Sequence, residues 1–340
     1  MTVSEDFTVL TGQFRGELLA HCYRMLGSAD EAEDLVQETY LRAWRAYAGF
    51  EGRSSVRTWL YRIATNVCLT AIERRGRRAL PSGLGAPGDD PGSPVAVSPE
   101  VPWLQPIPDA RLAAAPGDPA AAAASRAGIR LAMVAALQHL SARQRAVLIL
   151  RDVLEWPVAE VADLLGTTTT AINSGLRRAR AQLTQALPAE EEVAEPTEPE
   201  RRALLDRFAA AFENADISTV AELLREDVAL EMPPVLTWFA GKRTVLRFIA
   251  SALLTTPGRF RLVATMANGH PAFAVYERGG DGTYGAHAVM VPTVTAAGIA
   301  RIVTFLDPAL FAMFGMPPRH GAAVAGPAPA QDLVVARWSR

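Results

Sequence analysis

Residues 155–183 read EWPVAEVADLLGTTTTAINSGLRRARAQL, and their pattern predicts two short helices joined by a tight turn. Pro157 suits the first turn of a helix, where its missing N–H costs nothing, and Gly166 breaks that helix. The hydroxyl of Thr167 or Thr168 can cap the second helix. Apolar residues then recur as one buried stripe, Ile172, Leu176, Ala179 and Leu183. This spacing is typical of a helix-turn-helix, whose second helix enters the major groove of DNA.

The other face of the second helix predicts contacts with DNA. Short polar side chains near its N-terminus can reach base edges and phosphates, and arginines further along can neutralise phosphate charge. The candidate residues are Thr168, Thr169, Thr170, Asn173, Ser174, Arg177 and Arg178. The alternative is an ordinary amphipathic helix with a solvated basic face, and this pattern alone does not decide between the two.

Charge is distributed unevenly along a chain whose net charge is −2. Residues 129–187 carry seven arginines against four acids, whereas residues 190–200 carry six glutamates. Binding partners respond to local patches of charge, so the nearly neutral total does not exclude nucleic acid.

Length and composition indicate a folded protein of more than one domain. The chain has 340 residues, of which 49% are hydrophobic, so sizeable cores can be buried. Cys22 and Cys68 form neither a disulfide framework nor a zinc-ligand pattern. The N-terminus lacks a signal-peptide pattern, and no apolar run is long enough to cross a membrane. We expect a soluble cytoplasmic protein without a metal or cofactor.

The N-terminal block contains a helix whose first turn is acidic, as helix N-termini favour. One face of this helix is predicted to be buried and holds Ala32, Leu35, Val36, Thr39, Tyr40 and Ala43. Leu41 and Trp44 project away from that face. Two large apolar side chains off the core side indicate a docking surface.

The next helix is predicted to bury Val56, Leu60, Ile63, Val67 and Ala71. Trp59, Arg62 and Asn66 share another face. That combination suits unpaired nucleic acid, because a ring stacks on a base, an amide reads its edge and an arginine holds phosphate. The alternative is that Trp59 is simply a core residue.

Two segments read as linkers. Residues 80–119 contain ten prolines and five glycines, a density that disfavours regular structure. Within them, PEVPWLQPIPD (99–109) carries Trp103, Leu104 and Ile107. Such apolar residues in a proline frame either dock on a partner or form a strap on the protein's own surface. PAEEEVAEPTEPE (188–200) is the second linker.

From residue 201 the pattern changes to helices followed by strands, which predicts an α+β domain. Hairpin turns are indicated at Asn268-Gly269 and at 279–282. The strand-like runs are 228–232, 261–266, 271–277, 286–294 and 299–306. We expect the Ala/Pro-rich tail past residue 320 to be disordered.

Longer motifs carry a family resemblance. DEAEDLVQETYLRAWR (30–45) and GFEGRSSVRTWLYRIATNVCLTAIERR (49–75) resemble domain 2 of bacterial sigma-70 factors of the extracytoplasmic-function group. LSARQRAVLILRDVLEWPVAEVADLLGTTTTAINSGLRRARAQL (140–183) resembles their domain 4. Together the two motif sets cover about half the chain, in the order the family has. The resemblance implies a non-enzymatic factor that binds core RNA polymerase and directs promoter-specific transcription initiation.

The resemblance also implies roles by position. The surface that grips polymerase would include Asp34, Leu35, Gln37, Glu38, Leu41 and Trp44. Phe50 and Asn66 match positions that capture a flipped-out base of the −10 element, and Trp59 and Arg62 lie in the helix tied to strand opening. Residues 168–178 would read the −35 element. Asn173 and Gly175 stand where basic or bulky residues are common in the group, which leaves the identity of that element open.

The third block, beginning LLDRFAAAFENADIS (204–218), resembles the SnoaL-like cone fold, in which helices cover a curved sheet around a pocket. The candidate pocket residues are Glu231, Trp238, Phe239, Tyr276, His287 and Asp307. His287 and Asp307 could act as an acid/base pair. The alternative is that His287 is a satisfied core residue. The long proline-rich linker resembles that of a subgroup with such an extra domain, where it would thread the polymerase cleft.

We therefore expect a multidomain protein with two all-α sigma domains and a C-terminal α+β SnoaL-like domain. The expected parts are 7–78 (domain 2), 79–120 (linker), 121–187 (domain 4), 188–200 (acidic linker), 201–320 (SnoaL-like domain) and 321–340 (tail).

The expected partners are core RNA polymerase, promoter DNA and a small-molecule ligand of the C-terminal domain, with no membrane. The main alternative is a SnoaL-like cyclase, isomerase or ligand sensor fused to a DNA-binding module. An operator-binding repressor would leave the helix around Leu41 and Trp44 unexplained.

Overall fold

The computed structural model describes residues 3–52, 54–112, 128–186 and 197–320, and the chain forms two compact units. The helical unit comprises Met1–Arg78 and Leu104–Ala189, and the C-terminal unit comprises Ala79–Trp103 and Glu190–Arg340. The expected tail 321–340 and most of the acidic linker 188–200 lie outside the described residues. Among the described residues, no helix combines the length and apolar character that a membrane crossing needs.

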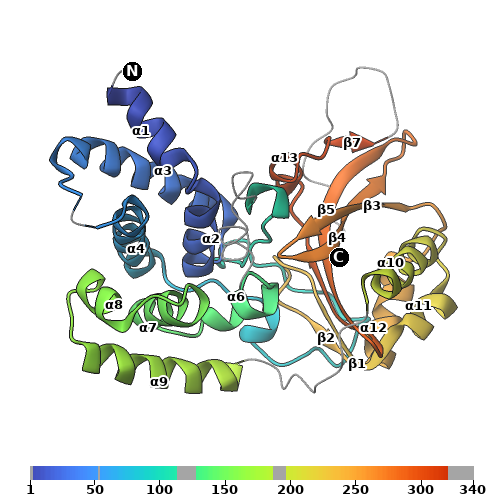
Figure 1. The fold of residues 1–340 in the computed structure, drawn as a ribbon. Helices are drawn as coiled ribbons and strands as arrows, with labels where there is room; N and C mark the ends of the chain where they lie inside the picture. The colour runs from blue at the N-terminus through green and yellow to red at the C-terminus, as the bar shows by residue number, and fades with distance from the viewer. Residues whose placement is uncertain (1–2, 53, 113–127, 187–196, 321–340) are drawn as a thin grey trace. The chain divides into compact units, whose positions relative to one another are not determined.

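The first part of the helical unit is built from α1 (Val3–Gly12), α2 (Arg15–Leu26), α3 (Ala29–Ala46) and α4 (Val56–Arg75). Figure 1 shows α2, α3 and α4 packed together. Ser28 caps α3 by accepting the Glu31 N–H at 3.3 Å, and Ser55 caps α4 by accepting the Thr58 N–H at 3.0 Å. These caps fix where each long helix begins.

The predicted buried faces of these two helices are confirmed only in part. In α3 the buried residues include Ala32, Val36, Thr39 and Ala43, whereas Leu35 and Tyr40 are half-buried. In α4, Leu60 and Val67 are buried, but the prediction is wrong for Val56, Ile63 and Ala71, which are half-buried. Tyr61, Ala64, Thr65 and Cys68 are buried in their place. The reason is that α4 contacts α2, α3 and α7, so its core face is not a single stripe.

The second part of the helical unit comprises α6 (Leu131–Leu137), α7 (Ala142–Leu148), α8 (Val158–Leu164) and α9 (Thr169–Ala186). Gly166 has a φ of 60° in the turn between α8 and α9, a conformation that glycine adopts without strain. Thr168 caps α9 by accepting the Ala171 N–H at 3.2 Å. Pro157 stands one position before α8, as its N-cap residue. The predicted helix-turn-helix geometry is confirmed.

A buried arginine ties the two parts of the helical unit together. Arg145 of α7 is 1% exposed, and its guanidinium donates to the side-chain oxygen of Gln138 at 2.7 Å and to the Leu140 carbonyl at 3.2 Å. It also donates to the Met25 carbonyl at the end of α2. Burial lowers the pKa of Arg145 to about 10, so it is still charged near neutral pH.

Replacing Arg145 by methionine should lower the free energy of unfolding of the helical unit by about 3 kcal/mol, because buried carbonyl acceptors lose a charged donor. Arg143→Met is the matched control, since Arg143 is an exposed residue of the same helix. Its effect should stay within about 0.5 kcal/mol. Urea denaturation followed by circular dichroism measures the free energy of unfolding of both variants. Equal decreases in the two variants would contradict the role of Arg145 in holding the two parts of the helical unit together.

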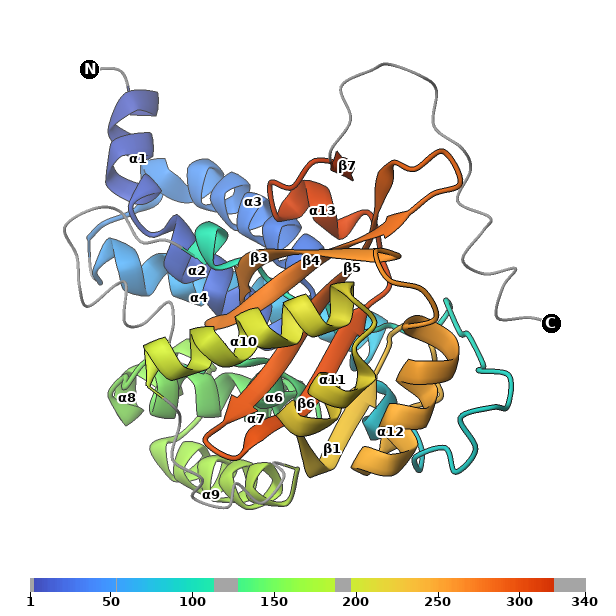
Figure 2. The ribbon, with the colours of Figure 1, turned by 90° about the vertical axis from the view of Figure 1, so that its right-hand side faces the viewer.

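The C-terminal unit is a curved mixed sheet covered on one face by helices, as Figure 2 shows for α10 and α11. Its helices are α10 (Glu198–Glu213), α11 (Ile217–Leu223), α12 (Lys242–Phe248) and α13 (Leu310–Met313). Its strands are β1 (Leu224–Glu231), β2 (Phe239–Ala240), β3 (Phe260–Ala267), β4 (His270–Arg278), β5 (Tyr284–Thr295), β6 (Gly298–Phe305) and β7 (Arg319–His320).

The main strands are ordered β2-β1-β6-β5-β4-β3, with β1 parallel to β6 and the other neighbours antiparallel. The apolar core lies between the sheet and α10–α12 and includes Phe208, Phe212 and Phe248. The five predicted strand runs all coincide with strands, and the turn at Asn268-Gly269 joins β3 to β4. The expected α+β class is confirmed.

Residues 79–103, called the strap below, belong to the C-terminal unit and are not a free spacer. Val95 is part of the apolar core of that unit. The strap exchanges backbone hydrogen bonds with residues 234–238, which include Leu236 N–H to the Ala96 carbonyl at 2.7 Å and Gly88 N–H to the Trp238 carbonyl at 2.7 Å. The strap is therefore held on the C-terminal unit by hydrogen bonds and apolar contacts despite its high proline content.

The apolar residues of PEVPWLQPIPD also pack against this chain. Trp103 is half-buried and donates from its indole N–H to the Ser98 carbonyl at 2.8 Å. Leu104 and Ile107 are buried in the helical unit, where the Tyr23 hydroxyl donates to the Gln105 carbonyl at 2.7 Å. Of the two interpretations of this stretch, the structure supports the one in which it packs on the protein itself. The domain boundaries predicted above stay a prediction.

Candidate functional site

The predicted docking surface is an exposed face of α3. Leu41 is 51% exposed and Trp44 is 42% exposed, although both are large apolar residues. Asp34 and Gln37 are also exposed, whereas Leu35 and Glu38 are half-buried. Both apolar and polar side chains of this helix are therefore open to water.

The N-terminal helix supports that surface, a feature that the sequence patterns did not reveal. Phe7 of α1 is buried, and its ring lies edge-on to Trp44 with centroids 5.3 Å apart. It makes the same kind of contact with Tyr47 at 5.2 Å. Edge-to-face contacts of this kind stabilise both rings, so α1 orients Trp44.

The candidate −10 residues come from α4 and from the loop before it. The rings of Phe50 and Trp59 lie 4.7 Å apart and 31° from parallel. Trp59 is half-buried, so it is not a core residue, and Asn66 is exposed two helical turns further along α4. The structure thus brings Phe50 and Trp59 together and leaves the Asn66 amide accessible.

Arg62 has a partner within the helical unit. It forms an ion pair with Asp163 of α8, the first helix of the helix-turn-helix. Beside it, the ring of Tyr61 lies 5.3 Å from that of Trp156, which is buried. Both charged side chains of the ion pair are substantially exposed, so the pair is worth at most about 1 kcal/mol. Arg62 would have to leave Asp163 to hold a phosphate.

The candidate −35 residues lie on the solvent side of α9. The predicted stripe is buried at Ile172, Leu176 and Ala179, and Leu183 is half-buried. The opposite face leaves exposed Thr168, Thr169, Thr170, Asn173, Arg177 and Arg178, with Ser174 half-buried. The neighbouring Arg180 instead forms a two-point ion pair with Asp152, at 2.7 and 2.8 Å, which neutralises its charge.

Of the six residues predicted to line a pocket in the C-terminal domain, His287 lines the apolar cavity of the cone, and the other five make the following contacts elsewhere in the described residues. Glu231 pairs with Arg301 and accepts the Ser82 N–H, and Trp238 donates to the Gly85 carbonyl. Phe239 stacks on Phe248, the Tyr276 hydroxyl donates to the Pro317 carbonyl, and Asp307 accepts the Ala309 N–H. Side chains alternate across a strand, so Glu231 and Tyr276 point away from the face that carries Leu230 and Val275.

The cavity itself has a volume of about 30 Å³ and lies between the sheet and its helical cover. Its wall is almost entirely apolar, and His287 and Thr304 are its polar members. The apolar lining residues are Phe212, Leu230, Met232, Ile249, Leu253, Phe260, Val275, Met290, Ile302 and Leu306.

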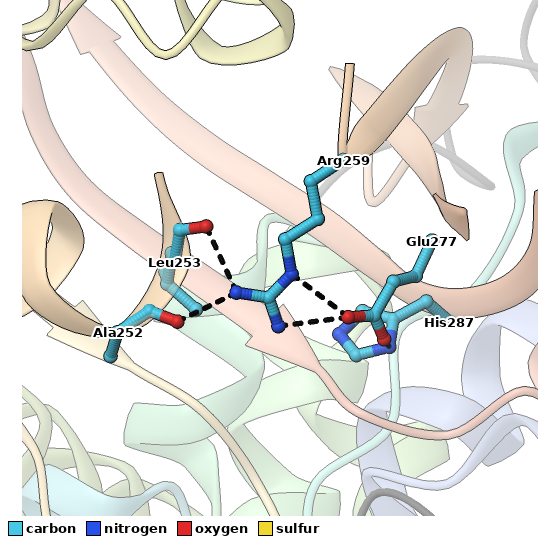
Figure 3. Close-up of polar contacts among 5 residues, drawn as sticks. All are labelled: Ala252, Leu253, Arg259, Glu277 and His287. Carbon is cyan, nitrogen blue, oxygen red and sulfur yellow. Dashed lines mark hydrogen bonds and ion pairs between the residues drawn. The ribbon is translucent and has the colours of Figure 1, made fainter. Parts of the chain in front are cut away.

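The partner of His287 is Glu277 rather than Asp307, which corrects the predicted acid/base pair (Figure 3). The Glu277 carboxylate lies 3.2 Å from Nδ1 of His287. Its other oxygen accepts from Arg259 Nε at 2.9 Å and Nη2 at 2.8 Å. Arg259 also donates to the carbonyls of Ala252 and Leu253 at 2.8 and 3.1 Å.

Electrostatics keep Glu277 ionised. Burial raises the pKa of this carboxyl. Hydrogen bonds and charge from His287 and Arg259 lower it by a larger amount, and the net result is a pKa of about 2. The sequence did contain a signal for this pair. The turn at 279–282 sets a hairpin register in which Glu277 lies opposite Gly285, two residues from His287 and on the same face.

Comparisons with known proteins agree with this architecture. The family models that match are Sigma-70 region 2 over residues 10–78, Sigma-70, region 4 over 130–183, and a SnoaL-like domain over 205–305. The three matches follow the order expected from the sequence motifs.

Named relatives match over most of the chain. The ECF RNA polymerase sigma factor SigG of Mycobacterium tuberculosis is 50% identical over 314 residues, which cover 92% of this chain and 84% of the relative. SigJ of the same organism, also an ECF RNA polymerase sigma factor, is 29% identical over 295 residues, which cover 83% of this chain and 84% of the relative.

A crystal structure of SigJ is similar with a TM-score of 0.57 and 25% identity, covering 93% of this chain and 100% of that chain. The predicted multidomain architecture, two sigma regions and a SnoaL-like domain, is confirmed. The chain belongs to the family of extracytoplasmic-function sigma factors of RNA polymerase.

Proposed function

We propose that this chain binds core RNA polymerase and directs it to a set of promoters, and that its C-terminal domain modulates that activity. The observation that carries the proposal is the exposed apolar pair Leu41 and Trp44 on α3, in a chain whose relatives are named sigma factors. Large apolar side chains held in water on an ordered helix are typical anchors of a protein interface.

Promoter opening would use the ring pair beside the polymerase surface. A base that leaves the DNA stack loses a few kcal/mol and regains this energy by stacking and by hydrogen bonds to its edge. Phe50 and Trp59 supply aromatic faces, and the exposed Asn66 amide supplies edge contacts. Arg62 would hold the adjacent phosphate after it releases Asp163.

Upstream DNA would be read by the N-terminal half of α9. Its exposed threonines and Asn173 can reach base edges, and Arg177 and Arg178 can contact phosphates. Arg180 is engaged by Asp152 and adds little free charge. The patch is thus smaller than the arginine content of the sequence indicates.

The C-terminal domain would act by holding the strap. In the sigma subgroup that this linker resembles, the segment between domains 2 and 4 threads the polymerase cleft. Here residues 79–103 of that segment are hydrogen-bonded to the C-terminal unit and contribute Val95 to its core. A strap held in this way is not available to polymerase, so its release would be a step toward activity.

A ligand sensor is the second candidate function, and the cavity beside His287 favours it. The enzyme alternative has less support, because Asp307 caps a turn instead of pairing with His287. The sensor and the sigma functions are compatible in one chain.

Transcription from chromosomal DNA tests the main proposal. Core polymerase is reconstituted with the purified chain and supplied with fragmented genomic DNA, and transcript 5′ ends are sequenced. We expect start sites that share −10 and −35 sequences and that core polymerase alone does not use. Start sites identical with and without the chain would overturn the proposal.

Replacing Arg177 and Arg178 by alanine should weaken promoter binding and reduce its salt dependence. Each lost phosphate contact removes about 0.9 from the slope of log K against log salt concentration, so the double variant should lose about 1.8. Arg180→Ala is the matched control, since that arginine is paired with Asp152, and it should change the slope far less. Filter binding of holoenzyme to a mapped promoter at several salt concentrations measures all three slopes.

A further inference from the structure

We propose that Phe7 of α1 is a positioning residue for two surfaces of the helical unit at once, the polymerase-binding surface at Trp44 and the base-capturing loop at Phe50. The inference rests on the proposed function for what these two surfaces bind. The shared support is a property of the free chain, so it can be tested without polymerase or DNA.

Phe7 is a buried ring whose aromatic partners lie at the surface. Its side chain is 7% exposed. Its ring lies edge-on to Trp44, with centroids 5.3 Å apart, and edge-on to Tyr47, with centroids 5.2 Å apart. Trp44 is 42% exposed and Tyr47 is half-buried. Phe7 therefore holds two rings that water also reaches, and each contact favours one orientation of the partner ring.

The C-terminal end of α1 is fixed to α3, which gives Phe7 a defined position. The Tyr40 hydroxyl donates to the Thr11 carbonyl at 3.1 Å, and the Thr11 hydroxyl donates to the Phe7 carbonyl at 2.8 Å. Thr11 is buried. Burial raises the pKa of Tyr40 to about 12, so its hydroxyl keeps the proton that it donates.

Two successive backbone hydrogen bonds join Trp44, Tyr47 and Phe50. The Tyr47 N–H donates to the Trp44 carbonyl, and the Phe50 N–H donates to the Tyr47 carbonyl at 3.0 Å. The second bond closes the 3₁₀ turn Tyr47–Gly49, in which residues three apart lie one above the other. A displacement of Tyr47 therefore displaces Phe50 as well.

The last contact in this series is the ring pair of Phe50 and Trp59, whose centroids lie 4.7 Å apart. The series thus runs from Phe7 through Tyr47 and Phe50 to Trp59 of α4. Side chains that are ordered before a partner arrives avoid the cost of ordering them on binding. One support for both surfaces would present the base-capturing rings in a fixed geometry as soon as polymerase holds Trp44.

The simpler alternative is that Phe7 attaches α1 to the helical unit and orients Trp44 alone. The two interpretations differ at Trp59. The described ring contacts of Phe7 are with Trp44 and Tyr47, so a response of Trp59 to a change at Phe7 requires transmission through Tyr47 and Phe50.

The first test uses the free full-length chain, with its six tryptophans replaced by 5-fluorotryptophan. Trp44→Phe and Trp59→Phe assign two of the ¹⁹F signals. Phe7→Leu keeps an apolar side chain but loses the ring, and it should shift the signals of both Trp44 and Trp59. Val9→Ala is the matched control, because Val9 is 72% exposed on the same helix, and it should shift neither signal.

Two variants of Tyr47 keep this test decisive if Phe7→Leu detaches α1. Tyr47→Leu leaves the contact between Phe7 and Trp44 in place and should still shift the Trp59 signal. Tyr47→Phe keeps the ring and should leave that signal unchanged. A Trp59 signal that stays in place in both Phe7→Leu and Tyr47→Leu would overturn the inference.

The second test separates polymerase binding from promoter opening. Opening is followed by 2-aminopurine fluorescence in the −10 element of a mapped promoter, at a chain concentration that saturates core polymerase, so that weaker binding does not limit it. Phe7→Leu should weaken polymerase binding and slow opening, each by about fivefold, because each surface loses one edge-to-face contact. Tyr47→Leu should slow opening by a similar factor and leave binding unchanged, and Tyr47→Phe and Val9→Ala should match the wild type in both measurements.

Wild-type opening by Phe7→Leu at saturation would overturn the shared role, whether or not polymerase binding is weakened. A wild-type chain that fails to bind core polymerase would instead contradict the proposed function. The ¹⁹F spectra of the free chain would still decide the role of Phe7, so the two failures are distinguishable.

Discussion

Replacing Leu41 and Trp44 together by alanine should abolish the capture of core RNA polymerase by the full-length chain. Both residues are large and apolar and remain about half exposed on α3. Buried interface anchors of this size contribute about 2 kcal/mol or more each, so the double variant should bind about a thousandfold more weakly. Surface plasmon resonance with immobilised core polymerase measures the loss directly.

A matched control is available on the neighbouring helix. Val9 of α1 is 72% exposed, and Val9→Ala removes apolar surface outside the proposed interface. Its binding should be unchanged. Trp44 also contacts Phe7, so thermal unfolding of both variants shows whether α1 stays in place. Capture at wild-type strength by a folded Leu41→Ala/Trp44→Ala variant would remove the observation on which the polymerase surface rests.

Local patterns in the sequence predicted the helix-turn-helix well. Its buried stripe, its glycine turn and its threonine cap depend on residues within four positions of one another, and the structure has all three. The strands of the C-terminal unit were equally predictable, because alternation along a strand and the turn at Asn268-Gly269 are also local.

Contacts between distant segments limited the predictions. The buried face of α4 widened because α7, more than 60 residues later, packs against it. The pairing of Arg180 with Asp152, and of Arg62 with Asp163, reduces the free charge that composition indicated. Neither pair follows from periodicity, since each joins different elements.

The cavity shows the same limit for a site. His287 was a candidate, but its partner Glu277 emerges only from the hairpin register, and its access to the cavity depends on a bulge. Val275 and Leu230 are core residues, and successive side chains of a strand point to opposite faces of the sheet. Their neighbours Tyr276 and Glu231 therefore point away from the core, which the alternation of the sequence already indicated.

A buried ion pair fastens the strap to the sheet of the C-terminal unit. Glu231 at the end of β1 is fully buried, forms an ion pair with Arg301 and accepts the Ser82 N–H at 2.9 Å. A buried carboxylate needs such partners, since an uncompensated charge in the interior costs several kcal/mol. The strap supplies one of them from a segment about 150 residues earlier in the chain.

Glu231→Gln should loosen the strap and raise transcription several-fold. The amide keeps the size of the side chain but leaves Arg301 without its counter-charge and weakens the bond to Ser82, a loss of about 3 kcal/mol. Hydrogen exchange of residues 79–103 should become faster. Run-off transcription by reconstituted holoenzyme should rise, because the released segment becomes available to polymerase.

Glu226→Gln on the same strand separates this effect from a general loss of charge. Glu226 is exposed and pairs with Lys242 at the surface, an interaction worth at most about 1 kcal/mol, so both exchange and transcription should stay at wild-type levels. Faster exchange in Glu231→Gln with unchanged transcription would show that strap release is not the regulatory step. The C-terminal domain would then have to act through another surface. A rise in both hydrogen exchange and transcription would identify the docked strap as the inhibitory element of the chain.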